Sequence, residues 1–263
     1  MGLVETEAVV LHTHKLAEAD KIVVCMTEKA GLVRGVARGA RRLKSRFGAG
    51  LEPFTHVQLT FFEKEARELV SIKGAEIIKS YFGAAKEVEA LAALEYLAEL
   101  VREFAPPHQA DPKLFRMLRA CVDALAEEPA RTSALIPYCE LWSLKLAGFL
   151  PDYRACAGCG KPLGGADADE VYITHEGLPR CRACRRAGQA VSADVYGLLR
   201  ALRTEGPHVW ARKFYAATRS EQQTLSGVAR GLVRRALERE PRSADFPQGA
   251  GLSRVAGGGG ESA

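Results

Sequence analysis

The apolar side chains of this chain follow a two-residue period near its start and a helical period from about residue 86 onward. In residues 55–62, Val57, Leu59 and Phe61 alternate with more polar positions, as in a strand that buries one face. Four further segments have strand-like composition and are bounded by glycine or charged turns, namely residues 5–11, 21–26, 32–36 and 68–72, the last continuing over 75–78. We therefore expect five strands within the first 80 residues.

No helical pattern separates these strands, so the chain has no crossover that would place sequential neighbours parallel. Five short antiparallel strands predict a small barrel, and the oligonucleotide/oligosaccharide-binding (OB) barrel is the natural candidate over residues 1–80. Such barrels bind single strands through a basic groove and stacking aromatic rings. The available rings also have to fill the core, where we expect at least half of them: Phe47, Phe54, Phe61 and Phe62.

The helical period begins in residues 86–104, where Leu94, Leu97 and Val101 recur at three- and four-residue steps. Further helices are expected over residues 112–125, 130–147, 192–203 and 221–239, with Asp111 and Ser192 as N-caps. We expect one helical domain in two parts, residues 81–150 and 191–240, with residues 151–190 inserted between them. The glycine-rich residues 241–263 predict a disordered tail. The fold class is thus α+β and multidomain.

Four cysteines dominate the inserted segment. They form two C-x-x-C pairs, Cys156 with Cys159 and Cys181 with Cys184, separated by 21 residues. Pairs at this spacing can direct four thiolates at one tetrahedral Zn²⁺, as in a zinc ribbon, and leave no open position for a substrate. Disulfides and free thiols are the alternatives. The other three cysteines, Cys25, Cys121 and Cys139, lie in apolar stretches and are expected to be buried.

A second distinctive feature is a basic segment between residues 29 and 51. It contains seven cations and no carboxylate: Lys29, Arg34, Arg38, Arg41, Arg42, Lys44 and Arg46. Lys and Arg neutralise phosphates and release condensed counterions, so a flexible loop of this composition favours contact with a nucleic-acid backbone. The alternative is a solvated loop whose charge keeps the protein soluble.

The C-terminal helical segment carries a second row of cations, Arg230, Arg234, Arg235 and Arg239. This arginine strip is interpreted either as a solvated helix face or as an auxiliary phosphate contact, and the sequence does not separate the two. Because the strip and the basic segment could each hold one strand, we expect them to act together if both bind.

Several short motifs resemble those of one known family. The segment GARRLKSR over residues 39–46, followed by LEPF over 51–54, resembles the N-terminal signature of RecO, a family of bacterial recombination mediators. YLAEL over residues 96–100 is similar to the family's first long helix. KLAGFLP over residues 145–151, which runs into Cys156, is similar to the junction between helix and ribbon in the zinc-bearing members.

This resemblance implies a non-enzymatic DNA repair protein of the RecF pathway. Members bind single- and double-stranded DNA, anneal complementary strands, engage the single-stranded-DNA-binding protein (SSB) and, with RecR, help to load RecA. Carried over by position, Arg41, Arg42, Lys44 and Arg46 would contact DNA and the four cysteines would hold one structural Zn²⁺. No motif assigns residues to SSB or RecR. The alternative is an interaction scaffold, or an RNA-binding protein, that does not anneal strands.

Enzyme and membrane classes find little support in the sequence. Gly160-Lys161 lacks the spacing of a nucleotide-binding P-loop, and His175-Glu176 lacks the His-x-Glu of a zinc deaminase. His12 and His14 share one strand face and could recruit a metal, although an ordinary strand-face role is commoner. There is no secretory signal and no apolar run of membrane-spanning length, so we expect a cytoplasmic, nucleoid-associated protein that uses no nucleotide.

Overall fold

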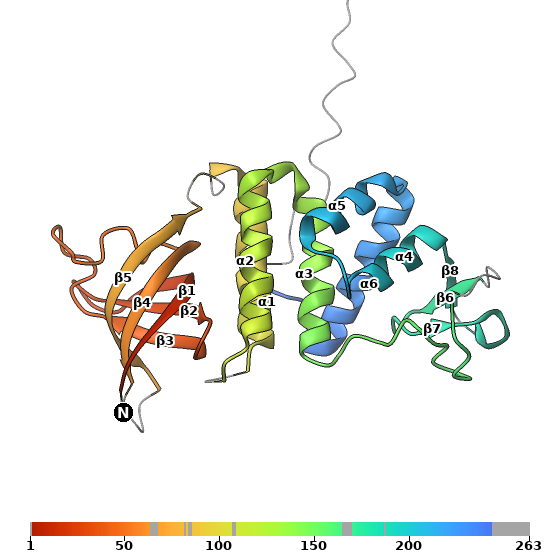
Figure 1. Ribbon diagram of the computed structural model, residues 1–263, viewed down its shortest axis with the longest axis horizontal. Helices are drawn as coiled ribbons and strands as arrows, with labels where there is room; N and C mark the ends of the chain where they lie inside the picture. Colours follow the sequence, from red (N-terminus) through yellow and green to blue (C-terminus); the bar gives the residue numbers. More distant parts are fainter. Residues whose placement is uncertain are drawn as a thin grey trace, which may run out of the picture.

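The computed structural model describes residues 2–63, 68–81, 83, 86–106, 109–164, 170–186 and 188–243. A barrel, a group of helices and a small ribbon follow one another along the long axis of the molecule (Figure 1). The residues predicted to form a disordered tail lie outside the described residues, apart from the turn at residues 241–243. No helix in these described ranges combines the length and the apolar character needed to cross a bilayer.

The five predicted strands are confirmed and close into a barrel. They are β1 (Gly2–Lys15), β2 (Lys21–Thr27), β3 (Gly31–Ala37), β4 (Thr55–Glu63) and β5 (Val70–Ser80), arranged in the order β1-β2-β3-β5-β4. The predicted inward face of β4 is also confirmed, because Val57, Leu59 and Phe61 are fully buried inside the barrel.

One correction concerns strand direction. The barrel was expected to be antiparallel throughout, but β3 and β5 pair in parallel over a short stretch, Gly35 with Val70 and Val36 with Ser71. The reason is topological: strands around a closed ring can alternate in direction only if their number is even. With five strands, one junction has to be parallel. Gly35 permits the close approach there, since a Cβ at this position would lie 2.7 Å from the Ile72 side chain.

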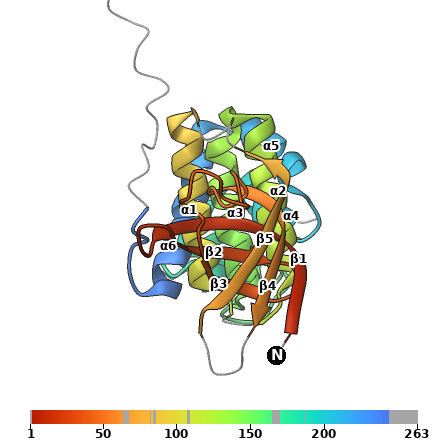
Figure 2. The same ribbon diagram turned by 90° about the vertical axis from the view of Figure 1, so that its left-hand side faces the viewer.

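Strand β1 is buried on both faces. Ala8 and Val10 point into the barrel core, whereas Val9 and Leu11 pack outward into the core formed by the helices. This explains why residues 8–11 are continuously apolar rather than alternating. Viewed from the barrel side, the strands lie directly in front of the helices (Figure 2). The barrel is therefore attached to the helical part through a shared apolar interface.

Polar contacts reinforce this interface. Glu7 on β1 accepts a hydrogen bond from Arg119 at 3.1 Å, and its other neighbour, His56 Nε2 of β4, lies 2.9 Å from the same oxygen. Arg119 belongs to α2, so this carboxylate joins two strands to a helix.

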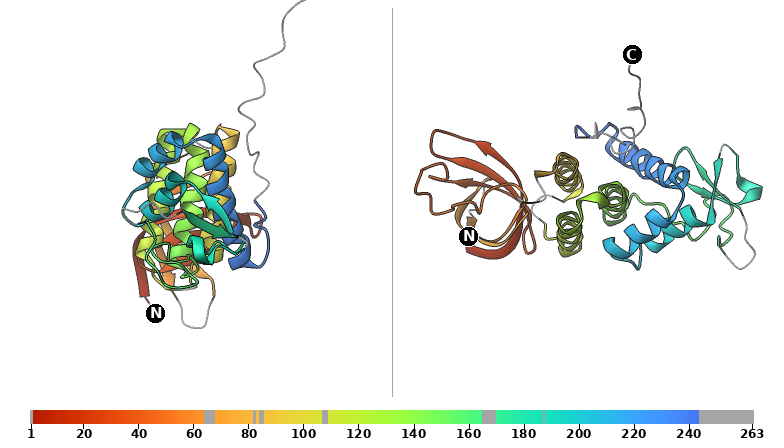
Figure 3. Two further views of the ribbon diagram at one scale, coloured as in Figure 1. Left: turned by 90° about the vertical axis from the view of Figure 1, so that its right-hand side faces the viewer. Right: turned by 90° about the horizontal axis from the view of Figure 1, so that it is seen from above.

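The helices are α1 (Val88–Phe104), α2 (Pro112–Glu127), α3 (Thr132–Leu146), α4 (Ala193–Ala201), α5 (Pro207–Ala216) and α6 (Arg219–Leu237). A short 3₁₀ turn, η2 (Pro129–Arg131), precedes α3. Both expected N-caps are confirmed: Asp111 accepts from the Leu114 N–H at 2.9 Å, and Ser192 accepts from the Val195 N–H at 3.3 Å. Seen from above, α1 and α2 lie between the barrel and the remaining helices (Figure 3).

Helix α5 was not expected from the sequence. It starts at Pro207, whose fixed φ suits the first helical turn, and it buries Trp210 and Phe214. The two rings stack with centroids 5.6 Å apart. Helix α5 thereby completes the packing around α3.

The ribbon contains β6 (Val171–Thr174), β7 (Pro179–Arg180) and β8 (Gly188–Val191), an antiparallel sheet in the order β7-β6-β8. Val171 and Ile173 join the apolar core of the helices. The turn after β6 packs closely on α6, because a Cβ at Gly177 would lie 2.5 Å from the Leu232 side chain. The ribbon is therefore packed directly against the helical part.

Candidate metal centre and nucleic-acid interface

Two backbone knuckles hold the four ribbon cysteines. In the first knuckle the Cys156 N–H donates a hydrogen bond to Lys161 O at 2.8 Å, and the Gly160 N–H donates one to Cys156 O at 2.9 Å. Gly160 has φ +74°, a conformation that glycine adopts without strain. The second knuckle is a short 3₁₀ turn, η3 (Arg182–Cys184). The first knuckle is joined to β7, the strand just before the second knuckle, by the Ala157 N–H, which donates to Pro179 O at 2.8 Å.

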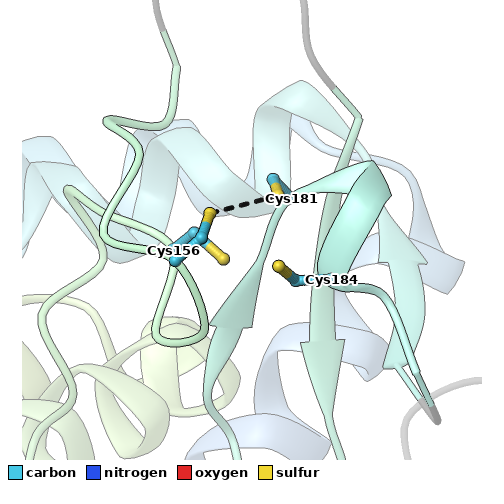
Figure 4. A group of neighbouring side chains, drawn as sticks. Cys156, Cys181 and Cys184 are labelled. Carbon is cyan, nitrogen blue, oxygen red and sulfur yellow. Dashed lines mark hydrogen bonds between the residues drawn. The ribbon is translucent and has the colours of Figure 1, made fainter.

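The four sulfur atoms converge as the spacing predicts. All of them lie within 4.8 Å of one another, and Cys159 Sγ is 3.8 Å from Cys181 Sγ. Figure 4 shows Cys156, Cys181 and Cys184 pointing into the space between the knuckles. Four thiolates at about 2.3 Å from a tetrahedral Zn²⁺ would be separated by about 3.8 Å. The donor set therefore fits a metal ion of this type.

The electrostatics of the sulfurs also suit a thiolate site. Burial by itself raises the pKa of Cys156, but N–H groups of Cys181, Gly158 and Cys159 point at the sulfur and lower this pKa to about 6. Hydrogen bonds that the Cys184 S–H donates to Cys159 and Cys181, together with burial, raise the pKa of Cys184 to about 12. One sulfur thus carries negative charge easily while a neighbour retains a proton, and binding of a dication would release that proton.

The histidines singled out from the sequence are not part of this centre. Within the described residues, the four cysteines form the one group of three or more potential metal ligands, and His175 is not among them. His12 and His14 do lie together, with ring centroids 4.3 Å apart. Burial, followed by the neighbouring His14 and Arg102, lowers the pKa of His12, so this imidazole favours its neutral form.

The basic segment lies on the barrel, and its cations are exposed. Lys29 and Arg34 belong to the strands and their turns, and the other five lie between β3 and β4 at residues 38–46. Arg34 is 3.8 Å from Glu68, but none of the other six forms an ion pair with a carboxylate in the described part of the chain. We call residues 38–46 the basic loop. Its charge is available to an external anion.

Internal hydrogen bonds define the conformation of the basic loop. Successive turns run through it, in which the Arg42 N–H donates to Gly39 O at 3.1 Å and the Ser45 N–H donates to Arg42 O at 3.0 Å. Its start is tied to the β1–β2 turn, because Arg41 Nη1 donates to Ala17 O at 2.9 Å. Its end is anchored by Phe47, which is buried in the barrel core. The cations are therefore presented on a fixed support.

Little aromatic surface accompanies these cations. Three of the four candidate rings, Phe47, Phe54 and Phe61, are buried, and Phe62 alone is partly exposed. The expectation that at least half would be core is confirmed. The loop instead exposes an aliphatic side chain, Leu43, which is 103% exposed.

The arginine strip on α6 has a different environment. Arg230 Nε is 2.9 Å from Glu140 Oε1, Arg234 pairs with Glu240 at 3.3 Å, and Arg235 pairs with Glu176 at 3.6 Å. Arg239 lies 2.6 Å from Glu103 and 3.7 Å from Glu99. Every cation of the strip thus has a carboxylate partner within the chain. Arg230 is also the least exposed of the four, with 20% of its side chain exposed.

Comparison with known proteins places both halves of the chain in one family. Residues 1–81 match the family described as "Recombination protein O N terminal", and residues 85–245 match "Recombination protein O C terminal". A protein named "DNA repair protein RecO" from a Nocardioides species is 38% identical over 234 residues, 86% of this chain and 92% of that protein.

Two more proteins of the same name are similar over shorter stretches. One from an Anaeromyxobacter species is 34% identical over 184 residues, 70% of this chain and 71% of its own length. One from Koribacter versatilis is 34% identical over 161 residues, 61% of this chain and 65% of its own length. Because the two family models together cover most of its length, this chain belongs to the RecO family.

Proposed function

We propose that this protein is a DNA-binding recombination mediator that anneals complementary strands. One observation carries this proposal: a fixed loop on an OB-type barrel presents five exposed cations, none of them paired with a carboxylate of the described chain. Unpaired Lys and Arg on a rigid support neutralise phosphates without first breaking internal ion pairs. The family's name, recombination protein O, agrees with this role.

Annealing needs no covalent chemistry from the protein. Two strands have to be brought together while their mutual repulsion is screened, and exposed cations provide that screening. We propose accordingly that the protein acts without nucleotide hydrolysis and without a catalytic residue. Its partners in this role are single- and double-stranded DNA, SSB and RecR, and through them RecA.

We propose further that the four-cysteine centre holds one structural Zn²⁺. Two observations support this assignment. The sulfurs are separated by distances that suit tetrahedral coordination, and four thiolates fill every coordination position of the ion, so none is left for water or substrate. The ion would stabilise the knuckles and supply no chemistry to DNA. Elemental analysis of protein purified under reducing conditions should give one zinc per chain, and a value near zero would contradict this assignment.

The annealing proposal has a direct test. Complementary oligonucleotides, bare and coated with SSB, are mixed with the protein in the absence of ATP, and duplex formation is followed by fluorescence. We expect acceleration on both substrates. Acceleration that requires ATP would contradict the proposal. Binding of single strands without any acceleration, or binding of RNA alone, would favour the scaffold or RNA-binding alternative.

A further inference from the structure

A group of arginines surrounds the second cysteine knuckle and is not explained by metal binding alone. Residues 177–193 contain no carboxylate but carry four arginines, Arg180, Arg182, Arg185 and Arg186. Within residues 180–186 they are four of seven residues, a density close to the five cations in nine residues of the basic loop. We call these four residues the knuckle arginines.

The knuckle arginines lack carboxylate partners. In the described ranges none of them forms an ion pair, whereas nearby Arg154 pairs with Asp152 at 2.7 Å. Arg185 Nη1 donates to the Tyr172 hydroxyl at 3.3 Å, and Tyr172 in turn donates to Glu170 at 2.7 Å. Arg182, Arg185 and Arg186 are exposed. These three cations are available to an external anion, as the cations of the basic loop are.

A bound metal accounts for part of this charge. Zn²⁺ with four thiolates has a net charge of about −2, which nearby cations would stabilise. Arg180 is placed for that role, because its guanidinium lies against the first knuckle: a Cβ at Gly158 would be 2.2 Å from Arg180 Nη1 and 3.2 Å from Cys184 Sγ. Full compensation of a charge of about −2 takes two cations, so four arginines exceed what the centre requires.

The location of the knuckle arginines gives them a separate role. The ribbon and the barrel lie at opposite ends of the long axis, with the helices between them (Figures 1 and 3). A nucleic-acid segment held by the basic loop would therefore not be the segment held at the ribbon unless it ran the length of the molecule. Two unpaired cationic surfaces at opposite ends suit two separate segments.

We propose that Arg182, Arg185 and Arg186 form a second phosphate-binding surface, through which one molecule holds a second DNA segment. This inference rests on the proposed function, since it assumes that the basic loop binds the first segment. The ligand is the phosphate backbone, recognised by charge and without regard to base sequence. The second cysteine knuckle then has two roles: its cysteines help to stabilise the fold of the ribbon, and its backbone fixes the spacing of these cations.

The test compares the full-length, zinc-loaded protein with the Arg182→Gln, Arg185→Gln, Arg186→Gln variant. Two non-complementary oligonucleotides of about 12 nucleotides, with a donor and an acceptor dye, report bridging by energy transfer at low salt. We expect the variant to lose bridging and to bind one oligonucleotide per chain instead of two. In the parent, the second binding event should have a salt slope of about 2, since each of three phosphate contacts contributes about 0.7 on single strands. The matched Arg→Lys variant should retain bridging.

Each alternative result has a distinct meaning. If the folded glutamine variant bridges like the parent, the knuckle arginines do not bind DNA and the inference is wrong. The same holds if the variant loses zinc while DNA binding is unchanged, because the arginines then only balance the metal charge. If the triple variant loses zinc and bridging together, the single variant Arg186→Gln separates the two effects. We expect it to keep zinc and to lower the salt slope of the second binding event by about 0.7. If the parent binds no DNA at all, the proposed function itself fails.

Discussion

The basic loop and the arginine strip have similar charge in the sequence and opposite environments in the structure. In the loop, Arg38, Arg42 and Lys44 are exposed and form no ion pair with a described carboxylate. In the strip, each of the four arginines faces a carboxylate from another part of the chain or from the end of its own helix. The cations of the loop face solvent, whereas those of the strip face carboxylates of the same chain.

This difference shows that charge density along a sequence does not measure the charge offered to a partner. A phosphate that approaches the strip has to compete with carboxylates such as Glu103 and Glu176, and the gain from each new contact is reduced by the lost ion pair. A phosphate at the loop displaces only water and counterions. Four variants, two of them with several substitutions, can sharpen or break this comparison.

The largest effect is expected at Arg230. The Glu140 side chain is 1% exposed, and it accepts hydrogen bonds from Arg230 at 2.9 Å and from the Tyr96 hydroxyl at 2.6 Å. Arg230→Ala would leave this carboxylate buried without its cation and should lower the free energy of unfolding by about 3 kcal/mol. Urea denaturation measures this change. Arg234→Ala, which removes an exposed pair, is the control and should cost about 1 kcal/mol or less.

The Arg230→Ala loss should depend on pH. Burial raises the pKa of Glu140, and Arg230 and Tyr96 oppose that rise. Without Arg230 the pKa of Glu140 in the folded state should rise further, so the folded protein holds a proton that the unfolded chain releases above about pH 4.3. Stability of the variant should therefore fall as the pH increases from that value toward neutrality. A destabilisation that is the same at pH 5 and pH 8 would contradict this account.

The next largest effect is expected in the basic loop. Replacing Arg41, Arg42, Lys44 and Arg46 by Ala should weaken single-strand binding by about 100-fold at moderate salt and reduce the salt slope by roughly 3, about 0.7 for each contact. The fold should survive, because these side chains are exposed and make few internal contacts. The matched Lys variant at Arg41, Arg42 and Arg46 should keep most of the slope. An unchanged salt slope in the folded Ala variant would show that the DNA-binding site lies outside the basic loop.

A smaller effect is expected for the exposed part of the strip. Arg234→Ala, Arg235→Ala and Arg239→Ala together should change single-strand binding by less than about twofold, since internal carboxylates already satisfy these cations. Stability should fall by about 1 kcal/mol, mainly through Arg239, whose partner Glu99 is 4% exposed. Annealing rates over a range of salt give the decisive measurement. Slower annealing with unchanged single-strand binding would show that the arginine strip contacts a second strand.

The smallest effect is expected at Leu43. This side chain is fully exposed among the loop cations, so Leu43→Ala should leave the free energy of unfolding within about 0.5 kcal/mol of the parent. If Leu43 packs on bases, affinity should fall by about twofold, while the salt slope stays constant because no charge is removed. A change of slope would show that the substitution disturbs the loop cations themselves.

Local signals in the sequence were sufficient for much of this structure. The C-x-x-C spacing predicted that the two sulfurs within each pair lie close together, because two intervening residues allow a single knuckle. Alternation in residues 55–62 predicted the buried face of β4, and Asp111 and Ser192 predicted the starts of α2 and α4. Each of these features depends on residues a few positions apart, which is the range over which a single sequence is informative.

Features that depend on distant residues were not predictable in the same way. The partners of the strip come from α1, α3 and the ribbon, for example Glu99, Glu140 and Glu176, and no local pattern pairs them with α6. The parallel β3–β5 junction follows from barrel closure, not from either strand. Helix α5 is an exception, because Gly206-Pro207 is a local start signal and its buried positions Pro207, Trp210, Ala211 and Phe214 follow a helical period within a short segment.

The two buried faces of β1 have a practical consequence for dissecting the protein. A fragment that ends after β5 would keep the barrel interior but would uncover Val9, Leu11, Met26 and Phe54, which pack against the helices in the whole chain. Exposed together on one side of a barrel, these side chains would form an adhesive patch that promotes self-association. An isolated barrel for studies in solution therefore needs polar replacements at Val9 and Leu11. Oligomers formed by the unaltered fragment would result from the truncation and would not reflect the oligomeric state of the whole chain.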